Sequence, residues 1–404
     1  MKYLLLGHGV ANNGAKKLLD MCNLDYDYLD IPEVKDEYDI IVKSPGISLN
    51  DDFFKCRNEE VISDIELGYR LVKPYIIAVT GSNGKTTVSS MIAHGLNRKY
   101  KTVLCGNIGY SFCEALADNM DKDIFVVEVS SFQLEGTNTF DPNIALILNI
   151  SPCHLDHHGS YNSYIESKIK IAKNQSVKHK LIYTLDSPFL KKINKEIISE
   201  SLSFSYDNIN SNIYYYDGYI YYLNNKVMKI KEKIKSFSYK ISNYMAVVGV
   251  LKEFGYSNLE IKKSIYSFKD VKYRLERLRF NIYNDAKSTN CASTKAALLG
   301  LNNVLLICGG YDRGIDIVLP EEALDRIVSV YAYGASKNKI KDFMDMHDIE
   351  CHIYNNLNEA FVDAYNNLSK ERNLLYSPMC ASFDQYESYV KRAEEFERLI
   401  KSIK

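Results

Sequence analysis

The eight residues Thr80–Thr87, which read TGSNGKTT, constrain the fold of this chain more than any other stretch. They follow the apolar run Tyr75–Val79 and precede a helical pattern that begins at Lys85. Glycine-rich loops between a buried strand and a helix bind phosphate through backbone N–H groups, while a lysine reaches the β/γ-phosphates and a hydroxyl ligates Mg²⁺. The first Gly of the usual GxxxxGK[ST] pattern is replaced by Val79. The alternative, a turn that only packs a strand against a helix, is disfavoured by the Gly-Lys-Thr-Thr sequence.

Further apolar runs predict the sheet around this loop. Buried strands are expected at 124–129 and 144–149, and their separation by helical stretches indicates a parallel sheet. Between about 200 and 240 the pattern changes to Tyr-rich alternation around Asp217-Gly218, which predicts an antiparallel meander. Its interleaved Tyr and Lys could stack on nucleic-acid bases, but aromatic residues are also good strand formers, and we favour the structural interpretation.

Two more α/β units flank the central one. Strands are expected at 3–6, 26–29 and 39–42 in the first, and at 280–283, 304–308 and 329–333 in the last. At roughly 150 residues per domain, 404 residues allow two or three domains. We predict an α/β protein with domains 1–72, 73–271 and 272–404. In the first turn Asn12 replaces the third Gly of the dinucleotide fingerprint, which argues against a nicotinamide cofactor.

Composition excludes several classes of partner. Lys plus Arg is 50 and Asp plus Glu is 51, so the net charge of −1 offers no general attraction to nucleic acid or an anionic membrane. No run of about 18 apolar residues is present, and the nine cysteines include no CxxC pair. Scattered thiols without a secretion signal fit a reducing compartment, so we expect a cytoplasmic protein without membrane insertion. We also expect a monomer.

Polar residues after two further strands extend the candidate site. Glu128 ends the strand after the phosphate loop, where a Mg²⁺ ligand is expected, although such a residue is often a solvated strand end. His154, His157 and His158 follow the next strand, and Lys168 lies on a helical stretch beyond them. Three histidines allow a zinc interpretation, but a single loop without a Cys pair disfavours a structural zinc site. We interpret His154 as a Mg²⁺ or substrate contact.

Taken together, these motifs resemble the Mur ligase family of ATP-dependent amide-forming enzymes, and EVSSFQL at 128–134 is similar to its D-glutamate-adding members. The resemblance covers essentially the whole chain in order. It continues in these stretches: GNIG at 106–109, HLD at 154–156, YRLE at 273–276, NDAKSTN at 284–290, CGGYDRG at 308–314 and SPMCASFDQ at 377–385.

The resemblance implies three domains: a Rossmann-like N-terminal domain for the UDP precursor, a central P-loop ATPase domain and a Rossmann-like C-terminal domain for the amino acid. It also implies ATP with two Mg²⁺ ions and a carbamylated lysine at Lys168. The nucleotide contacts implied are Gly81, Asn83, Gly84, Lys85, Thr86, Thr87, Asn243, Arg274 and Asp285. The metal ligands implied are Thr86, Glu128, His154 and Lys168. The substrate contacts implied are Asn107, His154, Thr289, Ser382 and Tyr389, with Lys85, His154, Lys168 and Lys287 as catalytic residues.

The implied reaction joins D-glutamate to UDP-N-acetylmuramoyl-L-alanine through an acyl phosphate. A related ligase that adds lysine, diaminopimelate or a folate-linked glutamate is the nearest alternative. The Asp-Asn-Pro-Arg stretch that the lysine- and diaminopimelate-adding enzymes resemble is missing, and the Ser-Ser-Phe-Gln-Leu and Ser-Pro-Met-Cys-Ala-Ser stretches differ from the folate signature. A non-catalytic nucleotide-binding relative is a second alternative. Such a protein would be expected to have lost one of Lys85, Glu128, His154 or Lys168, and all four are present.

Overall fold

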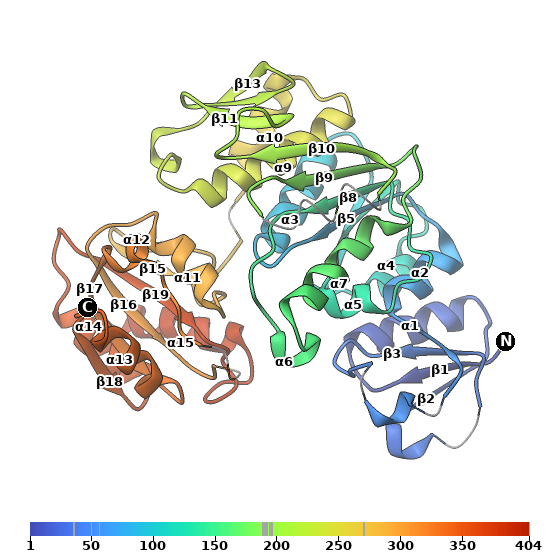
Figure 1. The fold of residues 1–404 in the computed structure, drawn as a ribbon, viewed down its shortest axis with the longest axis horizontal. Helices are drawn as coiled ribbons and strands as arrows, with labels where there is room; N and C mark the ends of the chain where they lie inside the picture. The colour runs from blue at the N-terminus through green and yellow to red at the C-terminus, as the bar shows by residue number, and fades with distance from the viewer. Residues whose placement is uncertain are drawn as a thin grey trace. The chain divides into compact units, whose positions relative to one another are not determined.

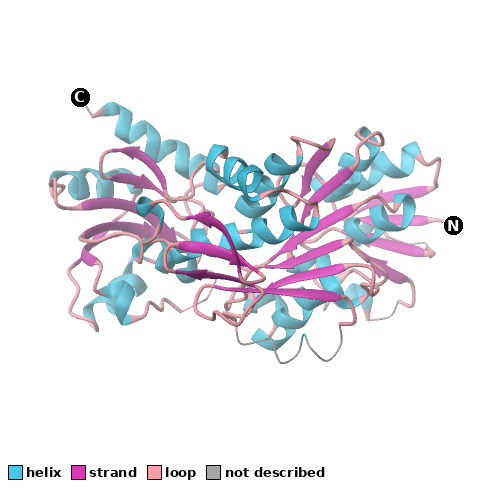
Figure 2. Cartoon of the chain, turned by 90° about the horizontal axis from the view of Figure 1, so that it is seen from above, coloured by secondary structure: helices cyan, strands magenta, loops and turns pink. Residues whose placement is uncertain are grey.

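The computed structural model describes residues 1–34, 37–49, 51–55, 57–187, 193, 197–269, 271–312, 314 and 316–403. The chain forms two compact units (Figure 1), and both contain helices and strands (Figure 2). Unit 1 contains 1–230 and 242–268, and unit 2 contains 231–241 and 269–404. The predicted mixed α/β class is confirmed.

The first sheet of unit 1 is a small parallel sheet with strand order β2-β1-β3-β4. Its strands are β1 (Tyr3–Leu6), β2 (Tyr26–Leu29), β3 (Ile40–Lys43) and β4 (Glu60–Ile62). Its helices are α1 (Val10–Met21) and α2 (Asp64–Val72), with single 3₁₀ turns at Ile31–Glu33 and Asp52–Phe54. The three predicted strands are confirmed, with β3 displaced by one residue.

The second sheet of unit 1 has nine strands in the order β13-β12-β11-β10-β9-β8-β5-β7-β6. Its strands are β5 (Ile76–Thr80), β6 (Thr102–Gly106), β7 (Ile124–Glu128), β8 (Ile144–Ile147), β9 (Lys180–Thr184), β10 (Glu200–Ser205), β11 (Ile213–Tyr216), β12 (Tyr219–Tyr222) and β13 (Asn225–Lys229). The neighbouring strands from β6 through β10 to β11 pair in parallel, whereas β12 pairs antiparallel with both β11 and β13. Both the parallel sheet and the antiparallel meander are therefore confirmed.

Helices that follow the strands of this sheet complete unit 1. They are α3 (Lys85–Leu96), α4 (Phe112–Asp118), α5 (Ser131–Glu135), α6 (Leu155–His158), α7 (Tyr161–Lys173), α9 (Ser238–Glu253, whose first residues belong to unit 2) and α10 (Asn258–Ser267). Strand β5 lies between β7 and β8, so the carboxyl ends of these three strands meet at one edge. This edge carries the predicted phosphate loop.

The sheet of unit 2 has the order β14-β15-β19-β16-β17-β18. Its strands are β14 (Glu276–Arg279), β15 (Ile282–Asn284), β16 (Val304–Gly309), β17 (Ile327–Tyr333), β18 (Cys351–Tyr354) and β19 (Asn373–Met379). Its helices are α11 (Cys291–Leu298), α12 (Glu321–Leu324), α13 (Lys337–Asp345), α14 (Leu357–Asn366) and α15 (Tyr389–Ser402), with a 3₁₀ turn at Glu232–Ile234. The strand expected at 280–283 is a hairpin instead. Phe280 lies 74% exposed in its turn, where the Arg277 guanidinium donates hydrogen bonds to the Phe280 carbonyl.

Helix α2 joins the two sheets of unit 1 through buried carboxylates. Glu66 accepts hydrogen bonds from the backbone N–H groups of 138, 139 and 140 at 2.8 to 3.0 Å. Both carboxylate oxygens of Asp64 accept from Gln133 Nε2, at 3.1 and 3.2 Å. Because Gln133 lies on α5 within the EVSSFQL stretch, these bonds connect the small sheet to the stretch that carries Glu128.

In the part of the chain that the structure describes, no helix combines the length and the apolarity needed to cross a bilayer. The eight cysteines among the described residues are free thiols.

Candidate active site

The phosphate loop turns from β5 into α3 with two glycines at positive φ, Gly81 at 153° and Gly84 at 84°. A Cβ at Gly84 would lie 2.7 Å from Asn243 Oδ1, so a larger residue would clash there. Lys85 folds back over the loop and donates hydrogen bonds to the carbonyls of Gly81 at 2.7 Å and Ser82 at 3.1 Å. Half-buried Thr86 continues the first turn of α3. The predicted glycines, Lys85 and Asn243 are therefore brought together.

Asn149, in the loop that follows β8, is hydrogen-bonded to the backbone of the phosphate loop. Asn149 Oδ1 accepts from the Asn83 backbone N–H at 2.8 Å, and Asn149 Nδ2 donates to the Asn83 carbonyl at 2.9 Å. Ser82 N–H donates to the Asn149 carbonyl at 2.8 Å. The sequence analysis did not single out Asn149, although its place directly after a buried strand was a usable signal.

Glu128 lies beside this loop because β7 pairs with β5 and places it opposite Val79. The residue is 3% exposed, and Asn107 Nδ2 donates to its Oε1 at 3.3 Å. Its Oε2 is buried and has no hydrogen-bond partner among the described residues. A buried carboxylate oxygen without a partner is costly unless another group binds it. An oxygen-seeking cation such as Mg²⁺ fits this position.

Lys168 reaches the same loop from α7. It is 1% exposed, and its Nζ donates to the Gly81 carbonyl at 3.1 Å and to Thr80 Oγ1 at 3.3 Å. Burial, and secondarily the charge of Lys85, holds the pKa of the Lys168 amine well below its usual value. The structure thus places Lys168 at the phosphate loop rather than on a solvated helix face.

His154 lies at the start of α6 with a left-handed φ of 55°. Its ring centroid is 5.0 Å from that of Phe132, which belongs to the EVSSFQL stretch. This packing joins two of the predicted motifs of unit 1.

In unit 2, the predicted nucleotide contact Asp285 directly follows β15, and its buried side chain accepts several hydrogen bonds. Its carboxylate accepts hydrogen bonds from Leu275 N–H at 3.0 Å, Ser288 Oγ at 2.6 Å and Ser377 Oγ at 2.8 Å. Burial raises the pKa of Asp285 above its usual value, against the opposing charge of Arg274. Asp285 therefore fixes the turn that carries Arg274.

The predicted amino-acid contacts lie in neighbouring loops of unit 2. Lys287 Nζ is 5.5 Å from the ring centroid of Tyr389, the first residue of α15. Ser382 is 2% exposed, and Thr289 is half-buried in the loop before α11. The structure thus places the Lys287 ammonium group over the Tyr389 ring.

Sequence reasoning missed Arg392, on α15, which organises these loops. Its guanidinium is fully buried and donates hydrogen bonds to four backbone carbonyls: Ala286 at 3.2 Å, Gly309 at 3.4 Å, Cys380 at 3.0 Å and Ala381 at 3.0 Å. These carbonyls lie at or just beyond the ends of β15, β16 and β19. No motif pointed to Arg392, because backbone carbonyl acceptors leave no trace in the sequence.

Comparisons with known proteins agree with this geometry. The sequence model of the Mur ligase middle domain matches residues 79–251. The chain is 32% identical to a UDP-N-acetylmuramoylalanine–D-glutamate ligase of Natranaerobius thermophilus, over 100% of this chain and 98% of that protein. It is 35% identical to the enzyme of that name from Streptococcus equi subsp. zooepidemicus, over 89% of this chain and 82% of that protein.

Solved structures with low sequence identity share the fold. The UDP-N-acetylmuramate-alanine ligase MurC of Thermotoga maritima matches with a TM-score of 0.64 at 15% identity, covering 100% of both chains. A MurF ligase of Thermotoga maritima in complex with ADP matches with a TM-score of 0.61 at 17% identity, over 90% of this chain and 88% of that one.

Proposed function

Because the chain belongs to the Mur ligase family, among its UDP-N-acetylmuramoylalanine–D-glutamate ligases, we propose that it uses ATP to join D-glutamate to UDP-N-acetylmuramoyl-L-alanine in peptidoglycan precursor synthesis. The observation that carries the proposal is the near end-to-end match to a relative of that name, together with a phosphate loop that adjoins a buried, half-satisfied Glu128. We propose that it acts in the cytoplasm as a monomer.

The phosphate loop of unit 1 is the proposed site of ATP. Gly81, Asn83 and Gly84 would line the phosphate site. Backbone N–H groups at the start of α3, together with Lys85 and Thr87, would hold the phosphates, with Asn243 near the base. Thr86 and Glu128 would hold one Mg²⁺, and His154 with a carbamylated Lys168 would hold a second. When bound, Mg²⁺ neutralises charge on the transferring phosphoryl group. The free Oε2 of Glu128 supports this assignment.

The proposed reaction has two steps. The carboxylate of the precursor's L-alanine attacks the γ-phosphorus, which gives an acyl phosphate and releases ADP. The amine of D-glutamate then attacks the acyl carbon, so that an amide forms and phosphate leaves. Lys85 would stabilise the charge that develops in the first step, and Asn107 and His154 would orient the precursor.

Unit 2 is the proposed source of the amino-acid site. Thr289, Ser382 and Tyr389 would contact D-glutamate, Lys287 would reach the transferring phosphoryl group, and Arg274 with Asp285 would contact the nucleotide. The buried Arg392 supports this assignment, because it ties together the loops that carry Lys287 and Ser382.

ATP-dependent phosphate release across a panel of UDP-muramoyl precursors and amino acids tests the proposal. We expect release only with UDP-N-acetylmuramoyl-L-alanine and D-glutamate together, and none with L-glutamate. Lys85→Ala should retain its circular-dichroism spectrum and lose the activity. Equal turnover with L-lysine, or with a folate acceptor, would overturn the assignment.

A further inference from the structure

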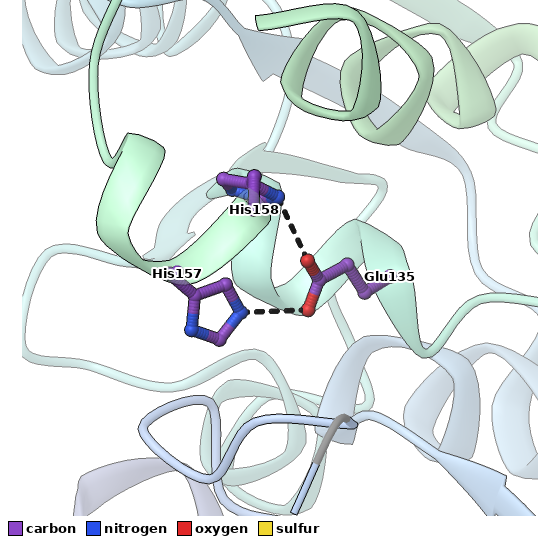
Figure 3. A group of neighbouring side chains, drawn as sticks. All are labelled: Glu135, His157 and His158. Atoms are coloured by element: carbon purple, nitrogen blue, oxygen red, sulfur yellow. Dashed lines mark hydrogen bonds and ion pairs between the residues drawn. The ribbon is translucent and has the colours of Figure 1, made fainter. Parts of the chain in front are cut away.

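A second cluster of candidate ligands lies on α5 and α6, outside the set assigned to ATP and Mg²⁺ (Figure 3). Glu135 Oε2 lies 2.9 Å from His157 Nε2, and Glu135 Oε1 lies 2.8 Å from His158 Nδ1. The three donor atoms all lie within 4.8 Å of one another. Within the described ranges, this is the one group of three or more His, Cys, Asp or Glu side chains with such spacing.

The cluster is largely shielded from solvent and held in place. The side chain of His158 is 1% exposed, that of His157 13% and that of Glu135 16%. The Phe132 ring lies 4.2 Å from the His157 ring and 5.5 Å from the His158 ring. Lys170 Nζ donates to the backbone carbonyl of Glu135 at 2.7 Å. The donors are therefore prearranged rather than scattered on a surface.

The second ring nitrogen of His158 has its own partner. His158 Nε2 lies 3.0 Å from Ser131 Oγ. Histidines that ligate metals usually donate their other ring N–H to an oxygen, which leaves the first nitrogen free to bind the ion. With Ser131 Oγ beside Nε2, His158 Nδ1 faces Glu135 and is the ring nitrogen placed to bind a metal.

We propose that Glu135, His157 and His158 form a binding site for one divalent transition-metal ion of the zinc type, separate from the Mg²⁺ of ATP. Two imidazoles and one carboxylate suit Zn²⁺, which binds such donors at about 2.0–2.2 Å, whereas Mg²⁺ prefers oxygen ligands. Donors at those bond lengths in a tetrahedron lie about 3.4 Å apart. The observed N–O separations of 2.9 and 2.8 Å, which involve different Glu135 oxygens, and the 4.8 Å limit on all ligand-atom separations bracket that spacing.

The structure also explains why the sequence did not reveal this site. The three histidines share one loop, and no Cys pair accompanies them. Glu135 comes from another helix, and His154 does not belong to the cluster. Three protein donors leave a fourth position for water, which is typical of an open site and not of a closed structural one.

Metal binding to the full chain, stripped with EDTA and free of nucleotide, tests the proposal. We expect one equivalent of Zn²⁺ to bind in excess Mg²⁺, as measured by calorimetry. Co²⁺ should give the visible absorption of a tetrahedral complex. Glu135→Gln and His157→Ala should each weaken Zn²⁺ binding at least tenfold, and Ser131→Ala should weaken it about 10- to 100-fold. Zn²⁺ should raise the melting temperature of the wild type more than that of these variants.

Two control variants locate the ion. His179→Gln removes another histidine–carboxylate pair of unit 1, His179 with Asp141 at 2.5 Å, which lacks a second histidine and should not affect binding. His154→Gln should also retain the Zn²⁺ site. No binding by the wild type, or unchanged binding in both Glu135→Gln and His157→Ala, would overturn the proposal, as would loss of binding in His154→Gln alone. Because nucleotide and precursor are absent, the outcome is independent of the proposed ligase activity.

Discussion

Lys168 shows how burial can change the chemistry of a single side chain. Its amine contacts only neutral oxygens of the phosphate loop in the hydrogen bonds described above, and burial lowers its pKa. Carbamate formation requires a neutral amine, so this environment favours the proposed modification, which would convert the cation into an oxygen ligand for a hard metal.

The carbamate predicts the behaviour of Lys168→Ala. We expect at least about a 100-fold loss of activity, comparable to the loss of a preorganised charge-stabilising group. Acetate should restore part of the activity, because it can supply the missing oxygen ligand. Exposed Lys173, on the same helix, gives the control Lys173→Ala, which should remain fully active. Full activity of Lys168→Ala without acetate would contradict the assignment.

Arg392 carries a second prediction at this scale. Arg392→Met removes the guanidinium donor from the carbonyls of Ala286, Gly309, Cys380 and Ala381. The Ala381 carbonyl still accepts from the Tyr311 N–H, whereas each buried carbonyl left unsatisfied costs about 1–3 kcal/mol. We expect the melting temperature to fall and the KM for D-glutamate to rise more than the KM for ATP, as measured by thermal unfolding and steady-state kinetics.

A second arginine on α15 provides a matched control for Arg392→Met. Arg398 lies on the same helix and pairs with Glu395 at the surface, so Arg398→Lys should change neither quantity. Equal increases of both KM values in Arg392→Met would indicate a general loss of structure and not the positioning of the amino-acid loops.

Residues that belong to a recognisable motif could be predicted from the sequence. Residues whose partners are backbone carbonyls or side chains of another helix could not. Lys85 and Glu128 follow from a strand, a glycine loop and a neighbouring strand end. Arg392 binds only carbonyls, and Glu135 meets His157 only after α5 and α6 have packed. Their partners depend on tertiary structure, which no local pattern encodes.

At the scale of elements, burial on both faces made strands easy to predict. The parallel strands β5, β7 and β8 are continuous apolar runs. Strand β14 reads Glu-Arg-Leu-Arg at the edge of its sheet, where half-exposed positions carry charges. The sequence therefore predicts a single strand at 280–283, which begins in the turn of the observed hairpin.

At the scale of elements, a buried carboxyl group on α2 predicts how the stability of the fold changes with pH. The helix begins at Asp64, which is fully buried and accepts hydrogen bonds from Gln133. Burial raises the pKa of Asp64 from 3.8 to about 6. Between these values the folded state binds more protons than the unfolded state, so this carboxyl stabilises the fold at low pH, and its contribution is lost as the pH rises through about 6.

Asp64→Asn removes this titration. The free energy of unfolding of the variant minus that of the wild type should increase by up to about 3 kcal/mol between pH 4 and pH 7. A shift of two pKa units corresponds to that energy. Urea unfolding at both pH values measures the difference. Asp52→Asn, at a side chain that is 88% exposed, should show no such change. A difference for Asp64→Asn that stays constant with pH would contradict the assigned titration.

At the scale of the whole molecule, the two compact units do not coincide with the three domains predicted from the sequence. Unit 1 contains both the small sheet and the nine-stranded sheet, because α2 and α1 pack against helices of the larger sheet. Unit 2 also takes 231–241, which sequence reasoning assigned to the central domain. Those assignments depend on contacts between distant segments. The division into 1–72, 73–271 and 272–404 stays a prediction.

The proposed reaction uses residues of both units and so predicts a conformational response. Lys85 and Glu128 belong to unit 1, whereas Asp285 and Lys287 belong to unit 2. Acyl transfer requires the acyl phosphate and the D-glutamate amine to be held within reacting distance, which lid and domain motions commonly achieve. The chain passes between the units near 230, 241 and 268, and these crossings are the candidate hinges.

We therefore expect a non-hydrolysable ATP analogue and UDP-N-acetylmuramoyl-L-alanine, added together, to reduce the radius of gyration measured by small-angle X-ray scattering. Either ligand alone should have a smaller effect, because only the pair provides groups for both units to bind. Lys85→Ala, which loses a phosphate contact, should show little change at the same concentrations. If calorimetry shows both ligands bound to the wild type and the radius of gyration is constant, the predicted closure of the units on binding is contradicted.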